Sequence, residues 1–306
     1  TNTVRIQSRN YPLDVIELDS LEIREKEFDN LPHDGNGRVV VVVGAGVAGL
    51  TCAEMLGRRG FKAIVLEKDD KIGGQIQLAD KPPKKEKLGW SFVDMRTNAE
   101  KFGAEIILNT EATPEIIASY NPYAVVIATG ACAVKPRSIE GVNLANVYTT
   151  TQILSGEVKL ENKTVALIGS GMTGLETAEM LIEHDNKVAI VDMSDTLAPG
   201  TWFQHLDDIV PKLDAKGTEY ILSHKLNLID EKGIVIEPVK LDKHQKTVSQ
   251  GKPYHVDADA VVLSLGARSV NSLAKELEGK VQNLFVIGDA MKVGRIADAT
   301  REAYDV

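Results

Sequence analysis

The chain has 306 residues, 43% of them hydrophobic and 26% charged, which is typical of a soluble globular protein large enough for two domains. A net charge of −9 excludes the basic surface that nucleic-acid binding needs. No apolar run approaches the ~20 residues that cross a bilayer, the polar first residues are unlike a signal peptide, and two cysteines 80 residues apart indicate neither a disulfide framework nor a metal cluster. We therefore expect a cytoplasmic protein without membrane or nucleic-acid partners.

Residues 1–37 carry scattered apolar positions without a firm period, and 33–37 is a turn-rich stretch. We interpret 1–37 as an N-terminal arm or linker. It is either a surface arm packed on the first domain, or the tail of an upstream domain or a docking segment for a partner. The chain begins with Thr1 rather than Met, which would fit a piece of a longer protein.

The stretch from Arg38 to Glu67 predicts a dinucleotide-binding strand–helix–strand unit. Five valines, 39–43, form a buried strand and lead directly into the glycine motif of Gly44, Gly46 and Gly49. A helix is expected over 50–59 and a second strand over 61–66, and Glu67 lies 23 residues after Gly44. The glycines allow a tight turn, close approach of a pyrophosphate, and helix packing on the strand, while the acid accepts hydrogen bonds from ribose hydroxyls.

The rest of the first domain adds further ligand-binding signals. Lys68 follows Glu67, and the paired glycines before Gln75 allow the backbone to approach a ligand closely. We interpret the lysine-rich run 79–87 as a solvated loop. A helix over 92–102 and a strand over 105–108 follow. The buried strand 123–127 ends in Ala128-Thr129-Gly130, at the position where α/β sheets bind ligands.

The same pattern then repeats 125 residues later. Strand 164–168 leads into Gly169, Gly171 and Gly174, a helix is expected over 175–183, and strand 187–191 ends in Asp192, 23 residues after Gly169. The chain therefore carries two dinucleotide units. An acid at this position favours the free 2′-hydroxyl of NAD(H) over NADP(H). A vestigial, unoccupied second unit remains the structural alternative.

Short strands are expected at 219–222, 233–236 and 254–256, forming a small layer. A buried strand over 260–265 ends in Gly266, and strand 284–287 leads into Gly288-Asp289 before a helix over 296–304. We therefore predict an α/β fold of two Rossmann-like domains, the second inserted in the first. The expected divisions are 38–150 with 276–306 for the first domain and 151–275 for the second.

Two glycine motifs, the Ala-Thr-Gly turn and the late strand-Gly-Asp together resemble the two-dinucleotide-binding-domain flavoproteins. The resemblance covers about residues 38–306 and implies that the first unit holds FAD and the second NAD(P)H. It implies the following FAD contacts: Gly44, Gly46, Gly49, Glu67, Lys68, Gly74, Gln75, Thr129, Gly130, Gly288 and Asp289. The implied nicotinamide-dinucleotide contacts are Gly169, Gly171, Gly174, Glu176, Asp192 and Gly266.

A narrower resemblance rests on IGGQ near residue 72, VVLSLGARSVNSL and the ending FVIGDAMKVGRIADATREAYDV. These are similar to the C-terminal half of the old-yellow-enzyme-type NADH:flavin oxidoreductases, a group with 2,4-dienoyl-CoA reductase, enoate reductases and trimethylamine dehydrogenase. In that group an N-terminal barrel carries FMN and is followed by an iron–sulfur cluster. This sequence contains neither part, so it resembles the FAD/NAD(P) half alone, and a barrel domain or subunit is the implied partner, with a homo-oligomer also possible.

Departures from the wider superfamily affect the expected chemistry. No Cys-x-x-Cys or Cys-x4-Cys pair occurs, and we expect Cys52 to be a core residue and Cys132 to lie near the flavin without a partner cysteine. Glu176 is interpreted as a nicotinamide contact or as a first-turn acid that complements the helix dipole. His205 and His224 are expected on the surface or in loops.

The function predicted from these features is an FAD-dependent NADH oxidoreductase, a diaphorase module that passes electrons to a partner. No catalytic side chain is assigned, because hydride transfer between cofactors requires no protein acid or base. Two alternatives stay open: a non-catalytic module that binds ADP structurally, and a free-standing NADH oxidase.

Overall fold

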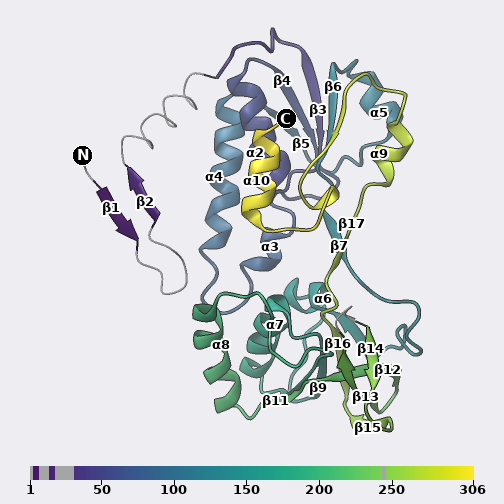
Figure 1. Ribbon diagram of the computed structural model, residues 1–306. Helices are drawn as coiled ribbons and strands as arrows, with labels where there is room; N and C mark the ends of the chain where they lie inside the picture. Colours follow the sequence, from purple (N-terminus) through teal and green to yellow (C-terminus); the bar gives the residue numbers. More distant parts are fainter. Residues whose placement is uncertain (1–2, 7–13, 18–30, 243–245) are drawn as a thin grey trace.

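The computed structural model describes residues 3–6, 14–17, 31–242 and 246–306. Two α/β units lie one above the other in Figure 1 and are joined by two extended segments. Each unit is built on a parallel sheet, which confirms the predicted fold class. Residues 1–2, 7–13 and 18–30 of the expected arm lie outside the described residues; within the arm, β1 (Thr3–Ile6) and β2 (Asp14–Glu17) pair antiparallel.

Five of the described strands form the sheet of the first unit. Their spatial order is β18 (Leu284–Val286), β6 (Ala124–Ile127), β3 (Val39–Val43), β4 (Lys62–Leu66) and β5 (Glu105–Ile107), and neighbouring strands pair parallel. The central strand β3 is buried on both faces, as its valine run predicts. Strand β18, which follows the whole second unit in sequence, completes this first sheet.

Helices cover both faces of this sheet. On one face α2 (Val47–Arg58) packs against α4 (Leu88–Lys101) and α10 (Ile296–Tyr304), and the even-numbered valines of β3 lie in this core. On the other face α5 (Pro114–Ser119) and α9 (Ser272–Leu277) bury Ile117 and Leu277 against Val41 and Val43. The short α3 (Ile76–Ala79) lies beyond the carboxyl ends of the strands (Figure 1).

The second unit repeats the plan with a different cover on one face. Its described strands lie in the order β11 (Glu219–Ile221), β10 (Lys187–Val191), β9 (Thr164–Ile168), β16 (Ala260–Leu263) and β8 (Val147–Thr149). Helices α6 (Thr150–Leu154), α7 (Met172–Glu183) and α8 (Phe203–Ala215) contribute to the core on one face. An antiparallel layer of β12 (His224–Asp230), β13 (Gly233–Leu241), β14 (Thr247–Ser249) and β15 (Tyr254–Asp257) lies against the other.

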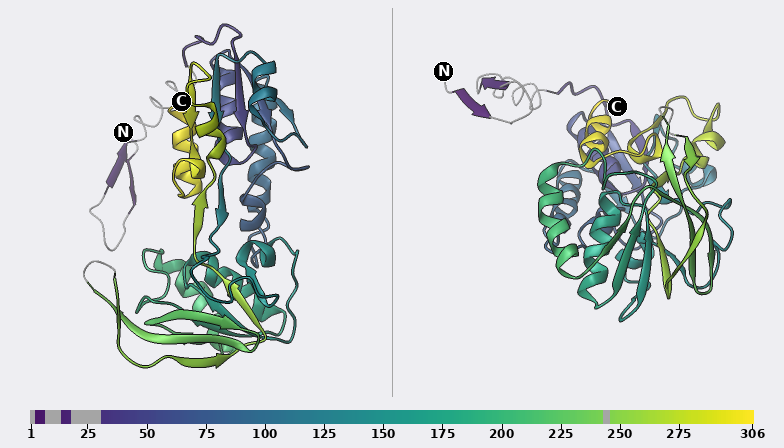
Figure 2. Two further views of the ribbon diagram at one scale, coloured as in Figure 1. Left: turned by 90° about the vertical axis from the view of Figure 1, so that its right-hand side faces the viewer. Right: turned by 60° about the horizontal axis from the view of Figure 1, so that its bottom comes forward.

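Two antiparallel strands connect the units. Strand β7 (Ala131–Ala133) carries the chain downward in Figure 1 and β17 (Ala267–Ser269) returns it, with Cys132 opposite Arg268. The elongated outline that results is clearest in the left view of Figure 2. Strand β8 lies before the expected boundary at residue 150 yet pairs in the second sheet, and α9 begins at Ser272, within the range 151–275 expected for the second domain, yet packs on the first.

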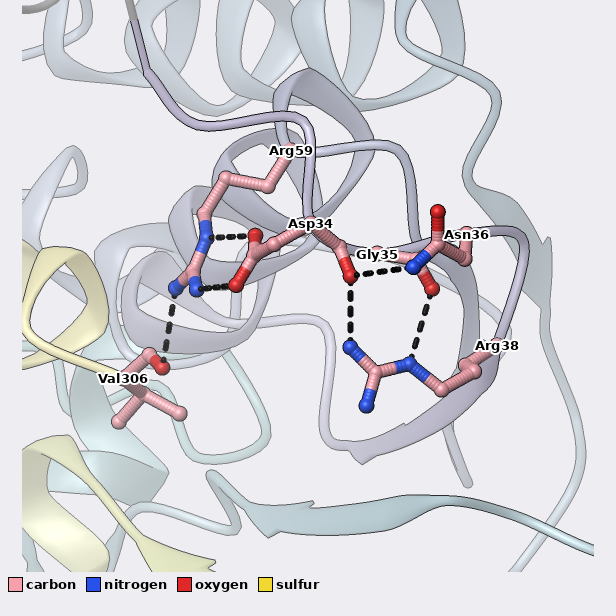
Figure 3. Close-up of polar contacts among 6 residues, drawn as sticks. All are labelled: Asp34, Gly35, Asn36, Arg38, Arg59 and Val306. Atoms are coloured by element: carbon pink, nitrogen blue, oxygen red, sulfur yellow. Dashed lines mark hydrogen bonds and ion pairs between the residues drawn. The ribbon is translucent and has the colours of Figure 1, made fainter.

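The described end of the arm, residues 31–37, is tied to the first unit rather than extended into solvent. Arg59, the residue after α2, donates to both carboxylate oxygens of Asp34 at 3.0 and 2.7 Å and approaches the backbone oxygen of Val306 at 3.5 Å (Figure 3). The guanidinium of Arg38 donates to the backbone oxygens of Asp34 and Gly35 and lies 3.9 Å from the ring centre of Tyr123. The arm therefore joins the unit at the amino ends of its strands.

Candidate functional site

The first glycine turn is held in a shape that only glycine allows. Gly44 has φ +104°, and a Cβ there would lie 2.5 Å from the backbone oxygen of Ala128. A Cβ on Gly49 would lie 1.9 Å from the backbone oxygen of Gly44. The sequence therefore brings the turn, the first turn of α2 and the end of β6 into backbone contact.

The middle glycine of the motif faces open space instead. Gly46 is the N-cap of α2, no side chain caps this helix, and the nearest atom to a Cβ on Gly46 is the Cα of Gly74 at 4.0 Å. A helix N-terminus with free N–H groups and no obstructing side chain is a binding site for phosphate. The residues present thus fit the pyrophosphate of a dinucleotide.

Glu67 fixes the turn from the end of β4. This carboxylate is 7% exposed, and its two oxygens accept hydrogen bonds from the backbone N–H groups of Ala45, at 2.7 Å, and Asp69, at 3.0 Å. A carboxylate oxygen accepts more than one hydrogen bond, so capacity remains for ribose hydroxyls. Lys68, the next residue, is exposed.

We call the turn of Gly44 to Gly49 with the N-terminus of α2 the cradle. Three segments that are distant in sequence meet beside it. The N–H of Gly73 donates to the oxygen of Ala45 at 2.8 Å, which places the glycine pair 73–74 against the first turn. The amide of Gln75 donates to the oxygen of Ala131 at 3.2 Å and to the carboxylate of Asp289 at 3.3 Å. The other oxygen of Asp289 accepts from the N–H of Gly294 at 2.9 Å.

The remaining predicted residues of the first unit surround this meeting point. The hydroxyl of Thr129 donates to the backbone oxygen of Val270, and Gly130 follows it at the end of β6. The N–H of Gly288 donates to the carboxylate of Glu302 at 2.6 Å. The sequence interpretation missed Glu302. This acid lies on the helix expected over 296–304, and its partner, Gly288, lies 14 residues earlier in the chain.

The second unit reproduces the first in detail. Gly169 has φ +104° and lies against the oxygen of Ser264, and a Cβ on Gly174 would lie 2.3 Å from the oxygen of Gly169. A Cβ on Gly171 would have nothing within 4 Å, so this cradle is open as well. The carboxylate of Asp192 accepts from the N–H groups of Ser170 at 2.5 Å and Ser194 at 2.8 Å.

Two interpretations of the site region are wrong. Glu176 lies beyond the first turn of α7, so it does not act as a first-turn acid. Its carboxylate forms an ion pair with Lys85, which the sequence had placed in a solvated loop, and Pro82 of that loop is buried. The loop therefore contacts the second unit.

Gly266 lies at the start of the return segment, where its oxygen accepts from the N–H of Val134 at 3.0 Å.

The two cysteines and the two histidines considered from the sequence lie as follows. Cys52 is 1% exposed in the core, as predicted, while Cys132 is exposed on β7. His205 lies on α8, and His224 begins β12 with its ring bonded to the oxygen of Leu222. Among residues 31–242 and 246–306, no group of acids, histidines and cysteines is arranged to hold a metal ion, and no described helix is long and apolar enough to cross a membrane.

Two open helix N-termini, each with an acid at the end of the next strand, define a protein with two dinucleotide-binding domains. The family model of the pyridine nucleotide-disulphide oxidoreductases matches residues 38–303, so the chain belongs to this family. Membership confirms the predicted class, an FAD-dependent oxidoreductase that uses a pyridine nucleotide.

Curated relatives and solved structures narrow the group. The chain is 32% identical over 291 residues to an NADH oxidase of Thermoanaerobacter brockii, covering 92% of this chain and 42% of the relative. It is 31% identical to a cinnamate reductase of Clostridium sporogenes, covering 92% of this chain and 41% of that one. A 2-naphthoyl-CoA reductase structure superposes with a TM-score of 0.79 at 27% identity, covering 90% of this chain and 40% of that chain. These matches confirm the predicted resemblance, and the chain spans about two-fifths of the length of these relatives.

Proposed function

We propose that this chain is the electron-entry module of a larger flavoenzyme. NADH binds to the second unit, FAD binds to the first, and the electrons leave to an acceptor carried by a partner domain or subunit. The observation that carries the proposal is the ladder between β7 and β17. It joins the carboxyl ends of β6 and β16, the edges at which parallel sheets bind ligands. The ladder is three paired residues long, or roughly 10 Å at ~3.3 Å each, and three residues at either end, 128–130 and 264–266, connect it to the two sheet edges.

The residues of the first unit have distinct tasks in this proposal. The N-terminus of α2 binds the pyrophosphate, and Glu67 orients the adenosine through its ribose hydroxyls. Gln75 and Asp289, already hydrogen-bonded to each other, hold the ribitol and flavin end near Ala131, the first residue of β7. FAD, when bound, supplies a two-electron acceptor for the hydride of NADH and a donor to the next carrier.

The second unit binds the reductant by the same geometry. The N-terminus of α7 takes the pyrophosphate, and Asp192 accepts from the adenosine ribose. A carboxylate whose oxygens are fixed by two backbone N–H groups disfavours a 2′-phosphate by charge repulsion. We therefore propose NADH as the preferred reductant over NADPH.

The electron acceptor lies outside this chain in the proposal. The relatives that the chain matches are more than twice its length and include an NADH oxidase and a cinnamate reductase. We infer a partner of the FMN and iron–sulfur barrel type, as a domain or a subunit, in a cytoplasmic enzyme that reduces an enoate or a dienoyl-CoA-like substrate. A homo-oligomer is compatible with this arrangement.

Anaerobic titration of the FAD-reconstituted chain with NADH tests the proposal. We expect the visible flavin absorbance to bleach with one equivalent of NADH, and NADPH to act more slowly. A flavin-loaded protein whose spectrum does not change would refute the proposal and favour a structural nucleotide-binding module. Rapid oxygen consumption without added acceptor would show instead that the chain is itself an NADH oxidase.

A further inference from the structure

The loop between α3 and α4 reaches from the first unit to the second. Residues 81–87, which we call the lysine loop, carry four lysines, one glutamate and two prolines. In Figure 1 this loop lies below α4, close to the top of α8 and away from the ladder of β7 and β17. The loop is distant in sequence from both connecting strands, β7 and β17. Its contact with α7 is therefore separate from theirs.

The contact between the lysine loop and the second unit is an ion pair. Lys85 forms an ion pair with Glu176 of α7, and these side chains are 28% and 12% exposed. One helical turn further along, Glu179 is 4% exposed and accepts from Lys212 of α8 at 2.7 Å, and Lys212 also donates to Asp208 at 2.6 Å. The pKa of Asp208 is lowered, chiefly by its hydrogen bond from Lys212, and the charges of Lys84 and His205 act in the same direction.

The loop and the two helices also enclose a shallow cleft. Pro83 and Lys85 line it from the first unit, and Met172, Glu179, Gln204 and Asp208 line it from the second. Because Met172 is the first residue of α7, the contact lies beside the N-terminus that faces the proposed nucleotide. A separate interunit hydrogen bond from Arg295 to the oxygen of Gly200 measures 3.4 Å.

We propose that the lysine loop is an electrostatic clasp that fixes the orientation of the second unit against the first, with Lys85 and Glu176 as positioning residues for electron transfer. A three-residue ladder alone leaves the units free to twist and bend about it. An ion pair with little solvent exposure, placed away from that ladder, supplies a further point of attachment beside the long hydrogen bond from Arg295 to Gly200. The positioning role of this pair rests on the proposed function, whereas its effect on the orientation of the units does not.

The variants follow from the chemistry of the pair. Lys85→Met keeps the apolar stem and removes the charge, and Glu176→Gln keeps the shape of the acid. The double variant Lys85→Glu with Glu176→Lys reverses both charges and restores the attraction. Lys87→Met is the matched control, since Lys87 belongs to the same loop but lies over the ring of Trp90 in its own unit.

The first readout is the distance between spin labels in the full chain without nucleotide, measured by pulsed electron resonance. Cysteines at the exposed positions Asn98 on α4 and Glu183 on α7, in a Cys132→Ser background, report on one unit each. We expect a single narrow distribution in the parent and the Lys87 control, a broadened one in both single variants, and a narrow one in the charge-reversed pair. An unchanged distribution in Lys85→Met and Glu176→Gln overturns the clasp.

The second readout is the rate at which NADH reduces bound FAD in the same variants. We expect about a tenfold fall in the single variants, because misplaced reactants lose rate steeply, and recovery in the charge-reversed pair. A broadened distribution with an unchanged rate overturns the positioning role. If NADH fails to reduce even the parent chain, the proposed function fails, and the label distances still decide whether the clasp exists.

Discussion

Alanine at two glycines of one motif should separate folding from nucleotide binding. A Cβ on Gly49 would lie 1.9 Å from the oxygen of Gly44, whereas ordinary contact begins at 3.4 Å. The turn and the helix would have to move apart by roughly 1.5 Å, and overpacking of this kind costs ~1–3 kcal/mol or more. We expect Gly49→Ala to lower the free energy of unfolding of the FAD-free chain by about 3 kcal/mol.

Gly46→Ala should leave the fold almost unchanged. Gly46 has φ −80° and ψ −170°, which alanine adopts without strain, and its Cβ would lie 4.0 Å from the nearest atom. Alanine is a poorer N-cap by roughly 0.5–1 kcal/mol, and it gains about 0.4–1 kcal/mol from the restricted unfolded chain, so the two effects nearly cancel. The new methyl group would occupy the proposed pyrophosphate space, and we expect at least about a tenfold loss of FAD affinity, or 1.4 kcal/mol.

Urea unfolding of both FAD-free variants, followed by FAD titration of the folded one, measures these effects. Gly174 and Gly171 form the corresponding pair in the second unit, with NADH as the ligand. If Gly46→Ala bound FAD as tightly as the parent chain, the open cradle would not be the phosphate site. If Gly49→Ala were as stable as the parent, the packing argument would be wrong.

Three further predictions concern single side chains. Burial raises the pKa of Cys52 to about 12, so we expect a thiol-alkylating reagent at pH 8 to modify only Cys132 in the folded chain and both cysteines in urea, as read by intact mass; alkylation of both in the fold would contradict this. Glu67→Gln should cost about 1–3 kcal/mol of FAD-free stability, because one buried backbone N–H then meets an amide N–H; an unchanged unfolding midpoint would show that the carboxylate does not hold the turn. The hydrogen bond from Arg59 lowers the pKa of Asp34 from its ordinary value of 3.8. The ion pair therefore stabilises the fold above that pH, and this stabilisation is lost as the pH falls through the pKa of Asp34 in the folded chain. The unfolding midpoint of Asp34→Asn should lie below that of the parent at pH 7 and converge with it in acid; a difference that persists in acid would exclude the ion pair as its cause.

The elements that the sequence predicted well are those specified by local pattern. The valine run of β3 and the helix over 296–304 were predicted at the bounds observed, because burial on both faces and a clean helical period need no knowledge of distant residues. Helix starts were less accurate: α7 begins at Met172 rather than at Leu175. Gly174 in the first turn lowers the helix propensity there. The helix nevertheless includes this residue, because Gly174 packs against Gly169 at the end of β9.

Features that depend on pairing between distant residues could not be read from the sequence. Strand β12 was missed because its polar and apolar residues alternate only weakly and its pairing with β13 shifts register. The lysine loop has the composition of a solvated segment, and only the position of Glu176, 91 residues later, gives Lys85 its partner. The glycine and acid positions of both cradles were found because turn geometry imposes them locally, while their role in binding FAD and NADH stays a prediction.

The joint at Asp34 and Arg59 has a consequence for the path of electrons. It holds the incoming chain at the amino ends of β3 and β4, whereas the proposed flavin lies beyond their carboxyl ends. A five-residue strand spans roughly 17 Å, so any carrier attached through the arm has to come back along the length of this unit to reach the flavin. Shortening the arm would therefore slow delivery to an attached acceptor while leaving reduction by NADH untouched.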